Sequence, residues 1–216
     1  MRLYKDGEYK LDTFFKKRKA LIKAIGPIEN EYDYEAMFMK YYKILSAEAY
    51  DEFRMPAFIA MGKDIEYFDK QIFMPNDGYY RLVWFIDTLK QKIKEYRIEP
   101  VTVPIDILLP ASSTNDIDPT YLEHASCNDE PIIAGIFPCV DPPMILIDGS
   151  HRIIGKKLKG ETEIQAYMLL PQQLVDSIQS EYIRKVAIAH NNIISMARYM
   201  AGMWSKEVFE GSLLEI

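Results

Sequence analysis

The sequence predicts an α+β protein, with a small mixed-sheet core between a helical N-terminal region and a helical C-terminal extension. Three observations lead to this fold class. First, 49% of the 216 residues are hydrophobic and 27% are charged, a composition typical of a folded chain. Second, short β-branched apolar runs are concentrated in residues 100–171. Third, residues 1–99 and 172–216 carry apolar side chains at helical spacing. We expect the C-terminal extension to pack on the core or on a partner.

The N-terminal region is expected to contain helices over residues 14–25, 34–53 and 79–97. The first begins after Asp12 or Thr13, either of which is a good N-cap, and it ends at Gly26-Pro27. The turn at residues 76–78 is expected to introduce the third helix. That helix has the clearest apolar face, formed by Leu82, Phe85, Ile86, Leu89, Ile93 and Tyr96.

The C-terminal extension carries one long apolar stripe at helical spacing. Its members are Ile183, Val186, His190, Ile193, Ala197, Met200 and Trp204. His190 lies on this stripe without a second metal-ligating residue nearby in the sequence. We therefore expect His190 to be a core or interface histidine rather than a metal ligand.

The middle region alternates between strands and helices. Strands are expected over residues 101–109, 131–136, 144–147 and 163–170, and helices over 116–126 and 150–159. Pro104 cannot donate a ladder hydrogen bond, so the first strand is expected at a sheet edge. Gly160 is expected to end the second helix. That helix and the strands on either side of it are expected to form a compact right-handed crossover unit.

The charge distribution argues against nucleic acid as a partner. The net charge is −6, and residues 100–170 contain 4 Lys and Arg against 10 Asp and Glu. A duplex-binding protein normally presents a basic face, because the release of counterions from phosphates drives most of its affinity. Residues 1–99, with 18 basic and 17 acidic side chains, do not supply a basic excess.

The apolar runs and the cysteines indicate where in the cell the protein is expected and whether it contains a disulfide. No run of about 18 uncharged apolar residues occurs, and the N-terminus lacks the apolar segment of a signal peptide. We therefore expect a cytoplasmic protein without a membrane partner. Cys127 and Cys139 are expected to be buried thiols, with a disulfide across their short loop as the alternative.

The segment Asp148-Gly149-Ser150-His151-Arg152 follows an apolar strand and opens a helix. The free N–H groups and the dipole at a helix start favour an anion at the edge of the sheet. Gly149 permits a sharp turn, and Ser150 can cap the helix or donate to a phosphate oxygen. A cation such as Arg152 opposes the dipole at this position unless an anion receives its guanidinium.

Further residues extend this predicted anion site. Lys156 lies one helical turn after Arg152 and is expected to reach the same place, whereas Asp148 and Glu130 are candidates for holding Mg²⁺ or for acting as a base. Two alternatives stay open. In the first, Arg152 pairs with an acidic neighbour instead of a ligand. In the second, Asp148 is a structural residue of the turn.

This arrangement resembles the ParB/sulfiredoxin superfamily over roughly residues 100–170. Members have a strand that begins Pro-Ile, then a strand ending in Asp-Gly-x-x-Arg or Gly-x-x-Arg, a helix, a glycine and a closing strand. The chain has Pro131-Ile132, the segment from Gly149 to Arg152 and Gly160 in this order. Gly155 stands where many members have alanine.

The resemblance implies a nucleotide site, because members bind CTP, ATP or ADP at this turn. Gly149, Ser150, His151 and Arg152 would then surround the phosphates. Ser150 replaces the reactive cysteine of sulfiredoxin, which argues against sulfinic-acid reduction. About 45 non-basic residues follow the core, which leaves little room for the DNA-reading helices of ParB. By likeness to the free serine kinases of this superfamily, Asp148 would serve magnesium or a substrate hydroxyl, with Glu130 as the second acid.

Three functional hypotheses follow. The first is a nucleotide-dependent enzyme that hydrolyses a nucleoside triphosphate or transfers a phosphoryl group, with Asp148, His151 and Glu130 as catalytic residues. Gly149, Ser150, His151, Arg152 and Lys156 would bind phosphate, and Asp148 would bind Mg²⁺. The second is a non-catalytic regulatory protein whose helical flanks bind a second copy or a protein partner. The third, a DNA-directed nuclease or regulator, is disfavoured by the charge distribution.

Overall fold

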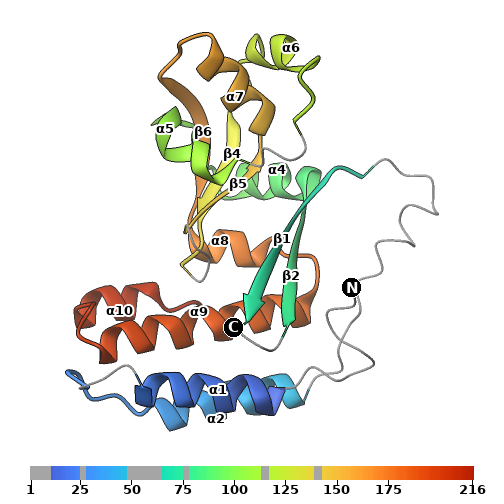
Figure 1. Cartoon of the computed structure of the whole chain (residues 1–216). Coiled ribbons are helices and arrows are strands. Elements are labelled where there is room, and N and C mark those ends of the chain that lie inside the picture. Colours follow the sequence, from blue (N-terminus) through green and yellow to red (C-terminus); the bar gives the residue numbers. More distant parts are fainter. Residues whose placement is uncertain (1–10, 25–27, 48–64, 75–77, 113–116, 139–142) are drawn as a thin grey trace. The chain divides into compact units, whose positions relative to one another are not determined.

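The computed structural model describes residues 11–24, 28–47, 65–74, 78–112, 117–138 and 143–216 (Figure 1). Within these residues the chain forms nine α-helices and two sheets, which confirms the predicted α+β class. The chain divides into two compact units. We call residues 66–68 and 84–177 the sheet unit, and the described parts of residues 1–65, 69–83 and 178–216 the helical unit. The N-terminal and C-terminal helices thus belong to one unit.

The sheet unit is built on four strands, β3 (Val101–Pro104), β4 (Ile132–Ile136), β5 (Met144–Asp148) and β6 (Glu163–Leu169). Their order is β3-β6-β4-β5, and the sheet is mixed because β4 runs parallel to β6 while the other pairs are antiparallel. The expectation that Pro104 lies in an edge strand is confirmed. The predicted crossover needs a correction, because the parallel pair is β4 and β6, and β5 lies beyond β4.

Helices cover both faces of this sheet. On one face, α5 (Ile105–Leu108) and α7 (Ser150–Leu158) enclose a core that includes Leu108, Leu146 and Ile153. On the other face, α8 (Pro171–Asp176) lies so close to β4 that a Cβ at Gly135 would be 2.8 Å from the Leu174 side chain. The short η1 (Leu109–Ala111) follows α5, so the predicted strand over 101–109 ends at Pro104.

A close contact between α6 (Leu122–Ser126) and α7 fixes the surroundings of the predicted site. A Cβ on Gly155 would come within 2.7 Å of the Leu122 carbonyl oxygen, so only glycine permits this approach. The predicted helix over 116–126 is shorter than expected, because residues 119–121 form a turn and Asp116 lies outside the described residues. Gly160 follows α7 with a φ of 83°, as expected for a glycine that ends a helix.

The predicted helix over 79–97 is wrong in its first half. Residues Gly78–Phe85 form strand β2, which pairs with β1 (Tyr67–Met74), and only Ile86–Glu95 is helical (α4). Burial along this strand fits a period of two, because Tyr80, Leu82 and Trp84 are fully buried. Residues 75–77, which include part of the expected turn, lie outside the described residues.

The helical unit contains α1 (Leu11–Ala24), α2 (Tyr34–Ser46), α9 (Glu181–Met200) and α10 (Lys206–Ser212). Helix α2 begins at an N-cap aspartate, Asp33, whose carboxylate accepts from the Ala36 backbone N–H. Helix α1 begins at Leu11, before the predicted N-caps. The predicted stop at Gly26-Pro27 and the predicted end of the second helix at residue 53 lie outside the described residues.

Helix α9 is the centre of this unit, and both α2 and α10 pack on it. The predicted apolar stripe is confirmed from Ile183 to Met200, whereas Trp204 lies beyond the end of the helix. Asn192 ties the C-terminal tail to α9, because its amide donates to the Leu214 carbonyl oxygen and accepts from the Leu214 N–H, both at 2.8 Å. The same amide donates to the Tyr41 hydroxyl, so α2 joins this network.

His190 is a core histidine, as expected. It is 3% exposed, and the Arg18 guanidinium donates to its Nε2 at 3.0 Å. Because arginine only donates, the neutral ring carries its proton on Nδ1 and donates to the Tyr80 hydroxyl at 2.9 Å. Burial, helped by the charge of Arg18, lowers the pKa of His190 to about 3. The ring is therefore neutral at physiological pH.

Candidate phosphate-binding site

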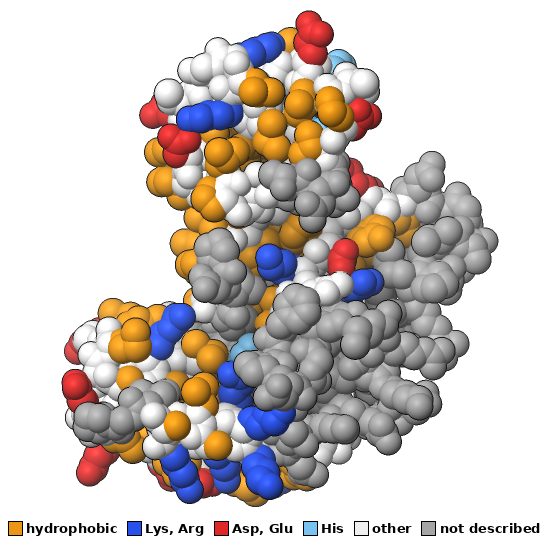
Figure 2. Space-filling view, viewed as in Figure 1, with side chains coloured by type: hydrophobic (Ala, Val, Ile, Leu, Met, Phe, Trp, Pro, Cys, Tyr) orange, Lys and Arg blue, Asp and Glu red, His pale blue; other side chains and the backbone are white. Residues whose placement is uncertain are grey.

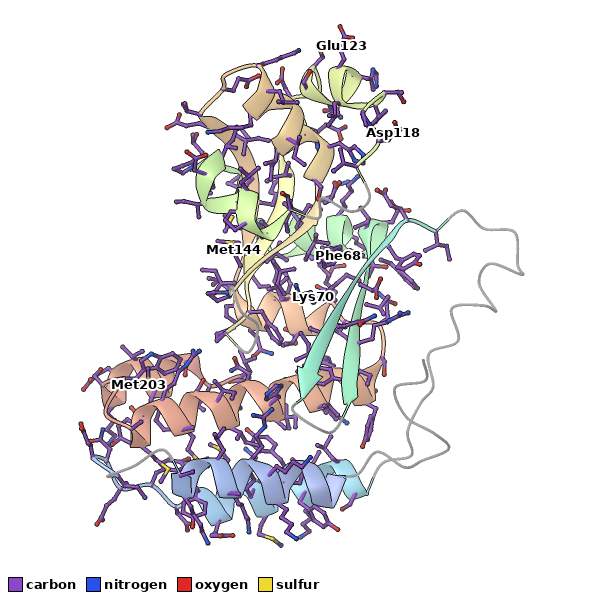
Figure 3. The ribbon with its side chains drawn as sticks, in the orientation of Figure 1. Phe68, Lys70, Asp118, Glu123, Met144 and Met203 are labelled. Carbon is purple, nitrogen blue, oxygen red and sulfur yellow. The ribbon has the colours of Figure 1, made fainter. Side chains whose placement is uncertain are left out.

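A pocket of about 240 Å³ lies in the sheet unit at the N-terminus of α7. It is lined by Glu66, Lys90, Tyr121, Ala125, Asn128, Glu130, Asp148, Gly149, Ser150, His151 and Arg152. In Figure 3 the labels Asp118 and Glu123 mark the segment around α6 that borders this end of α7. The structure thus brings together all the predicted site residues except Lys156.

The turn between β5 and α7 is fixed by Gly149. This residue has a φ of 106°, in the left-handed region that favours glycine. A Cβ there would lie 2.8 Å from Cβ of Ile132 and closer still to its Cγ2, so the space beneath the turn is filled. The N-cap is Gly149, without a side-chain capping bond, so of the two alternatives for Ser150 the structure does not have the capping one. Ser150 is instead the first helical residue and lines the pocket.

The guanidinium of Arg152 lies beneath this turn, and its terminal nitrogens are bonded to protein acceptors. One donates to Oδ2 of Asp148 at 2.8 Å, and the other donates to the backbone carbonyl oxygen of Glu130 at 2.9 Å. The side chain is 8% exposed. The structure thus has the predicted alternative in which Arg152 pairs with an acidic neighbour, Asp148. Arg152 therefore fastens the start of α7 to β5 and to the chain before β4.

His151 is held by the segment before α6. The backbone N–H of Asp118 donates to its Nε2 at 3.1 Å, and the Tyr121 ring meets it edge to face at 5.4 Å between centroids. Because Nε2 accepts this bond, a neutral ring carries its proton on Nδ1. In this arrangement His151 offers a donor rather than a base. The pKa of the Asp118 carboxyl is lowered, chiefly by the Thr120 hydroxyl that donates to it.

Lys156 does not belong to this pocket. Its ammonium donates to Asp129 at 2.7 Å and to Glu161 at 3.2 Å, and it lines a separate cavity of about 340 Å³ beside β6. The bond to Asp129, more than the one to Glu161, raises the pKa of Lys156. The expectation that Lys156 reaches the phosphate site is therefore wrong, because two carboxylates hold it on another side of α7.

Five lining residues were missed by sequence reasoning, Ala125 and four with polar side chains. Glu66, Lys90, Tyr121 and Asn128 lie outside the recognised motif, and Lys90 comes from α4, 60 residues before Ser150. Tyr121 and Asn128 flank α6, whose contact with α7 is signalled only by the small residue Gly155. No local pattern places Lys90 beside the turn, because its approach depends on the tertiary position of α4.

The carboxylates of the pocket do not form a resident metal centre. Among the described residues, no group of three or more His, Cys, Asp or Glu side chains is arranged to hold a metal ion. Asp148, the predicted Mg²⁺ ligand, uses Oδ2 in its ion pair with Arg152, and Glu130 is 73% exposed.

The predicted burial of both thiols is wrong for Cys127. This cysteine is exposed and free, and the Lys159 ammonium lies 3.1 Å from its sulfur. That contact is the main cause of the lowered pKa of Cys127. Cys139 lies outside the described residues.

No protein-family model, curated protein or solved structure matches this chain. The ParB/sulfiredoxin resemblance is therefore carried by the sequence motif alone. In the described part of the chain no helix is both long and apolar enough to cross a membrane.

Proposed function

We propose that this protein binds a phosphorylated ligand, foremost a nucleotide such as ATP, CTP or ADP, at the N-terminus of α7. The observation that carries the proposal is the turn from β5 through Gly149 into α7, which opens onto a pocket. The N–H groups of Ser150, His151 and Arg152 precede the first intrahelical bond, which Ile153 donates to Gly149. Such groups and the helix dipole attract an anion.

The contacts of the candidate catalytic residues favour binding over catalysis. Asp148 is paired with Arg152, and Nε2 of His151 accepts a backbone hydrogen bond. Both residues would have to exchange these contacts before they could serve as base or as metal ligand. A non-catalytic nucleotide-binding protein is therefore the preferred form of the proposal, and hydrolysis or phosphoryl transfer is the second form.

The variant Ser150→Asp separates ligand binding from stability. An acidic side chain in the first turn of α7 interacts favourably with the helix dipole, by about 0.3–1 kcal/mol, but repels a phosphate. We expect the variant to melt at the same temperature as wild type or slightly higher, and to lose the ligand response. Wild type at 100 times the dissociation constant should gain about 2.7 kcal/mol of stability.

The measurement is a thermal-shift panel of ATP, ADP, CTP, GTP and inorganic phosphate, with and without Mg²⁺. Ser205→Asp is the matched control, since it also places an acid at a helix start, the N-cap of α10, but in the helical unit. It should keep the full ligand response. If Ser150→Asp kept the full ligand response, the ligand would not bind at the N-terminus of α7. Release of inorganic phosphate from a triphosphate by wild type would favour the catalytic form.

A further inference from the structure

The two cations that line the pocket have different surroundings. Arg152 is 7% exposed, and its terminal nitrogens donate to Asp148 and to the Glu130 carbonyl oxygen. Lys90 is exposed, and among the described residues its ammonium takes part in no ion pair. A ligand in the pocket can therefore contact the Lys90 ammonium directly. The Arg152 guanidinium is buried beneath the turn and is already bonded to protein acceptors.

We propose that Lys90 supplies the direct cationic contact to the phosphate, and that Arg152 is a positioning residue for the turn. This inference rests on the proposed function and deepens it. Lys90 lies outside the segment that resembles the ParB/sulfiredoxin superfamily, so the resemblance does not imply this role. A lysine ammonium on its flexible stem suits this role as a point charge at the rim of a site.

The charges around the pocket favour a role for Lys90 in this contact. Three carboxylates line the pocket, those of Glu66, Glu130 and Asp148. Arg152 pairs with Asp148 at 2.8 Å and lies 3.8 Å from the carboxylate of Glu130, so its single charge is shared between two acids. The other cation that lines the pocket is Lys90, and the third carboxylate, that of Glu66, is exposed. With both cations the lining side chains have an excess of one negative charge, and without Lys90 that excess would be two. Lys90 therefore lowers the repulsion that a phosphate meets in the pocket.

Helix α4 holds Lys90 at a defined place in the sheet unit. Leu89 and Ile93 on the same helix are buried, at 0% and 4% exposure, so the face of α4 that they form is anchored in the core. Lys94, one turn further along the same helix, is also exposed but does not line the pocket. These two lysines form a matched pair for a test, since both substitutions change the net charge equally.

The volume of the pocket sets the size of the group that enters it. About 240 Å³ is below the range of roughly 300–1,000 Å³ for sites that enclose a whole drug-sized ligand. The pocket therefore holds a phosphoryl group with its nearest substituent, and the rest of a larger ligand lies outside. Inorganic phosphate and pyrophosphate are the smallest probes that contain this group.

The test is calorimetric titration of the full chain with inorganic phosphate and with pyrophosphate, at low and at moderate salt. Lys90→Met is expected to weaken binding by about five- to tenfold and to reduce the loss of affinity with salt. Its melting temperature should stay at the wild-type value, because Lys90 is exposed. Lys94→Met should bind as wild type does.

Arg152→Met distinguishes positioning from direct contact. It is expected to lower the melting temperature and the affinity, while the remaining binding keeps the salt dependence that Lys90 provides. If Arg152→Met removed the salt dependence and Lys90→Met kept it, the two roles would be reversed and the inference overturned. Equal affinity in Lys90→Met and wild type would also overturn it but leave the proposed function standing. If wild type bound neither phosphate nor pyrophosphate, both the inference and the proposed function would be wrong.

Discussion

Gly149→Ala is expected to lower the free energy of unfolding of the sheet unit by about 3 kcal/mol. Two effects add. An alanine at a φ of 106° is strained by about 1–2 kcal/mol, because its Cβ meets the following carbonyl oxygen. The same Cβ would lie 2.8 Å or less from Ile132, a buried residue of β4 that cannot move without disturbing the core. Overpacking of this kind costs about 1–3 kcal/mol.

Gly160→Ala is the control that separates these two effects. Gly160 also has a positive φ, 83°, but a Cβ there would have no atom within 4 Å. This variant should therefore lose only the backbone contribution, about 1–2 kcal/mol. Urea unfolding of both variants gives the comparison. Equal losses would show that Ile132 does not close the space beneath the turn.

Acidification is expected to destabilise the helical unit through His190. The pKa of this buried ring is about 3, below its ordinary value of 6.5. The unfolded chain therefore takes up a proton as the pH falls below 6.5, whereas the folded chain does not until about pH 3. Stability is fully present above pH 6.5 and falls by up to about 1.4 kcal/mol for each pH unit below it. At pH 4 the expected loss is about 3 kcal/mol.

The variant His190→Gln isolates this contribution from that of the carboxylates. Glutamine can still accept from Arg18 and donate to Tyr80, the two bonds that hold the ring, but it does not titrate. Urea unfolding at pH 7 and at pH 4 gives the loss for each protein. We expect the wild-type loss to exceed that of the variant by about 3 kcal/mol. Equal losses would mean that the ring is protonated in the folded protein.

Three of the four strands of the sheet unit were predicted well, because their apolar runs are short and end at turn residues. The fourth, predicted over 101–109, ends at Pro104, where α5 begins. The strand over 144–147 and the helix after it are separated by Gly149, a signal that is local and unambiguous. The error over residues 79–85 has a physical cause. Leu82, Phe85, Ile86 and Leu89 fall at helical spacing, yet the buried positions of the strand alternate as Tyr80, Leu82 and Trp84. Both periods fit, and pairing with β1 decides.

Apart from Glu130, the site was predicted only where it is continuous in sequence. The turn from Asp148 to Arg152 was found because its residue types specify a helix start. The partners of its side chains come from elsewhere: Glu130 and Asp118 bind Arg152 and His151, and Asp129 holds Lys156 away from the turn. Lys90 enters through the tertiary arrangement of α4, for which the sequence carries no local signal.

Titration of the isotopically labelled protein with inorganic phosphate, followed by ¹H–¹⁵N correlation spectra, tests the phosphate site most directly. We expect the amides of Ser150, His151 and Arg152 to shift together and saturably, because their N–H groups precede the first intrahelical bond of α7. The amides at the start of α9, after Ser180, should stay unchanged, because the Ser180 side chain accepts there from the Ile183 N–H. Saturable shifts elsewhere, with these three amides unmoved, would contradict a phosphate site at α7.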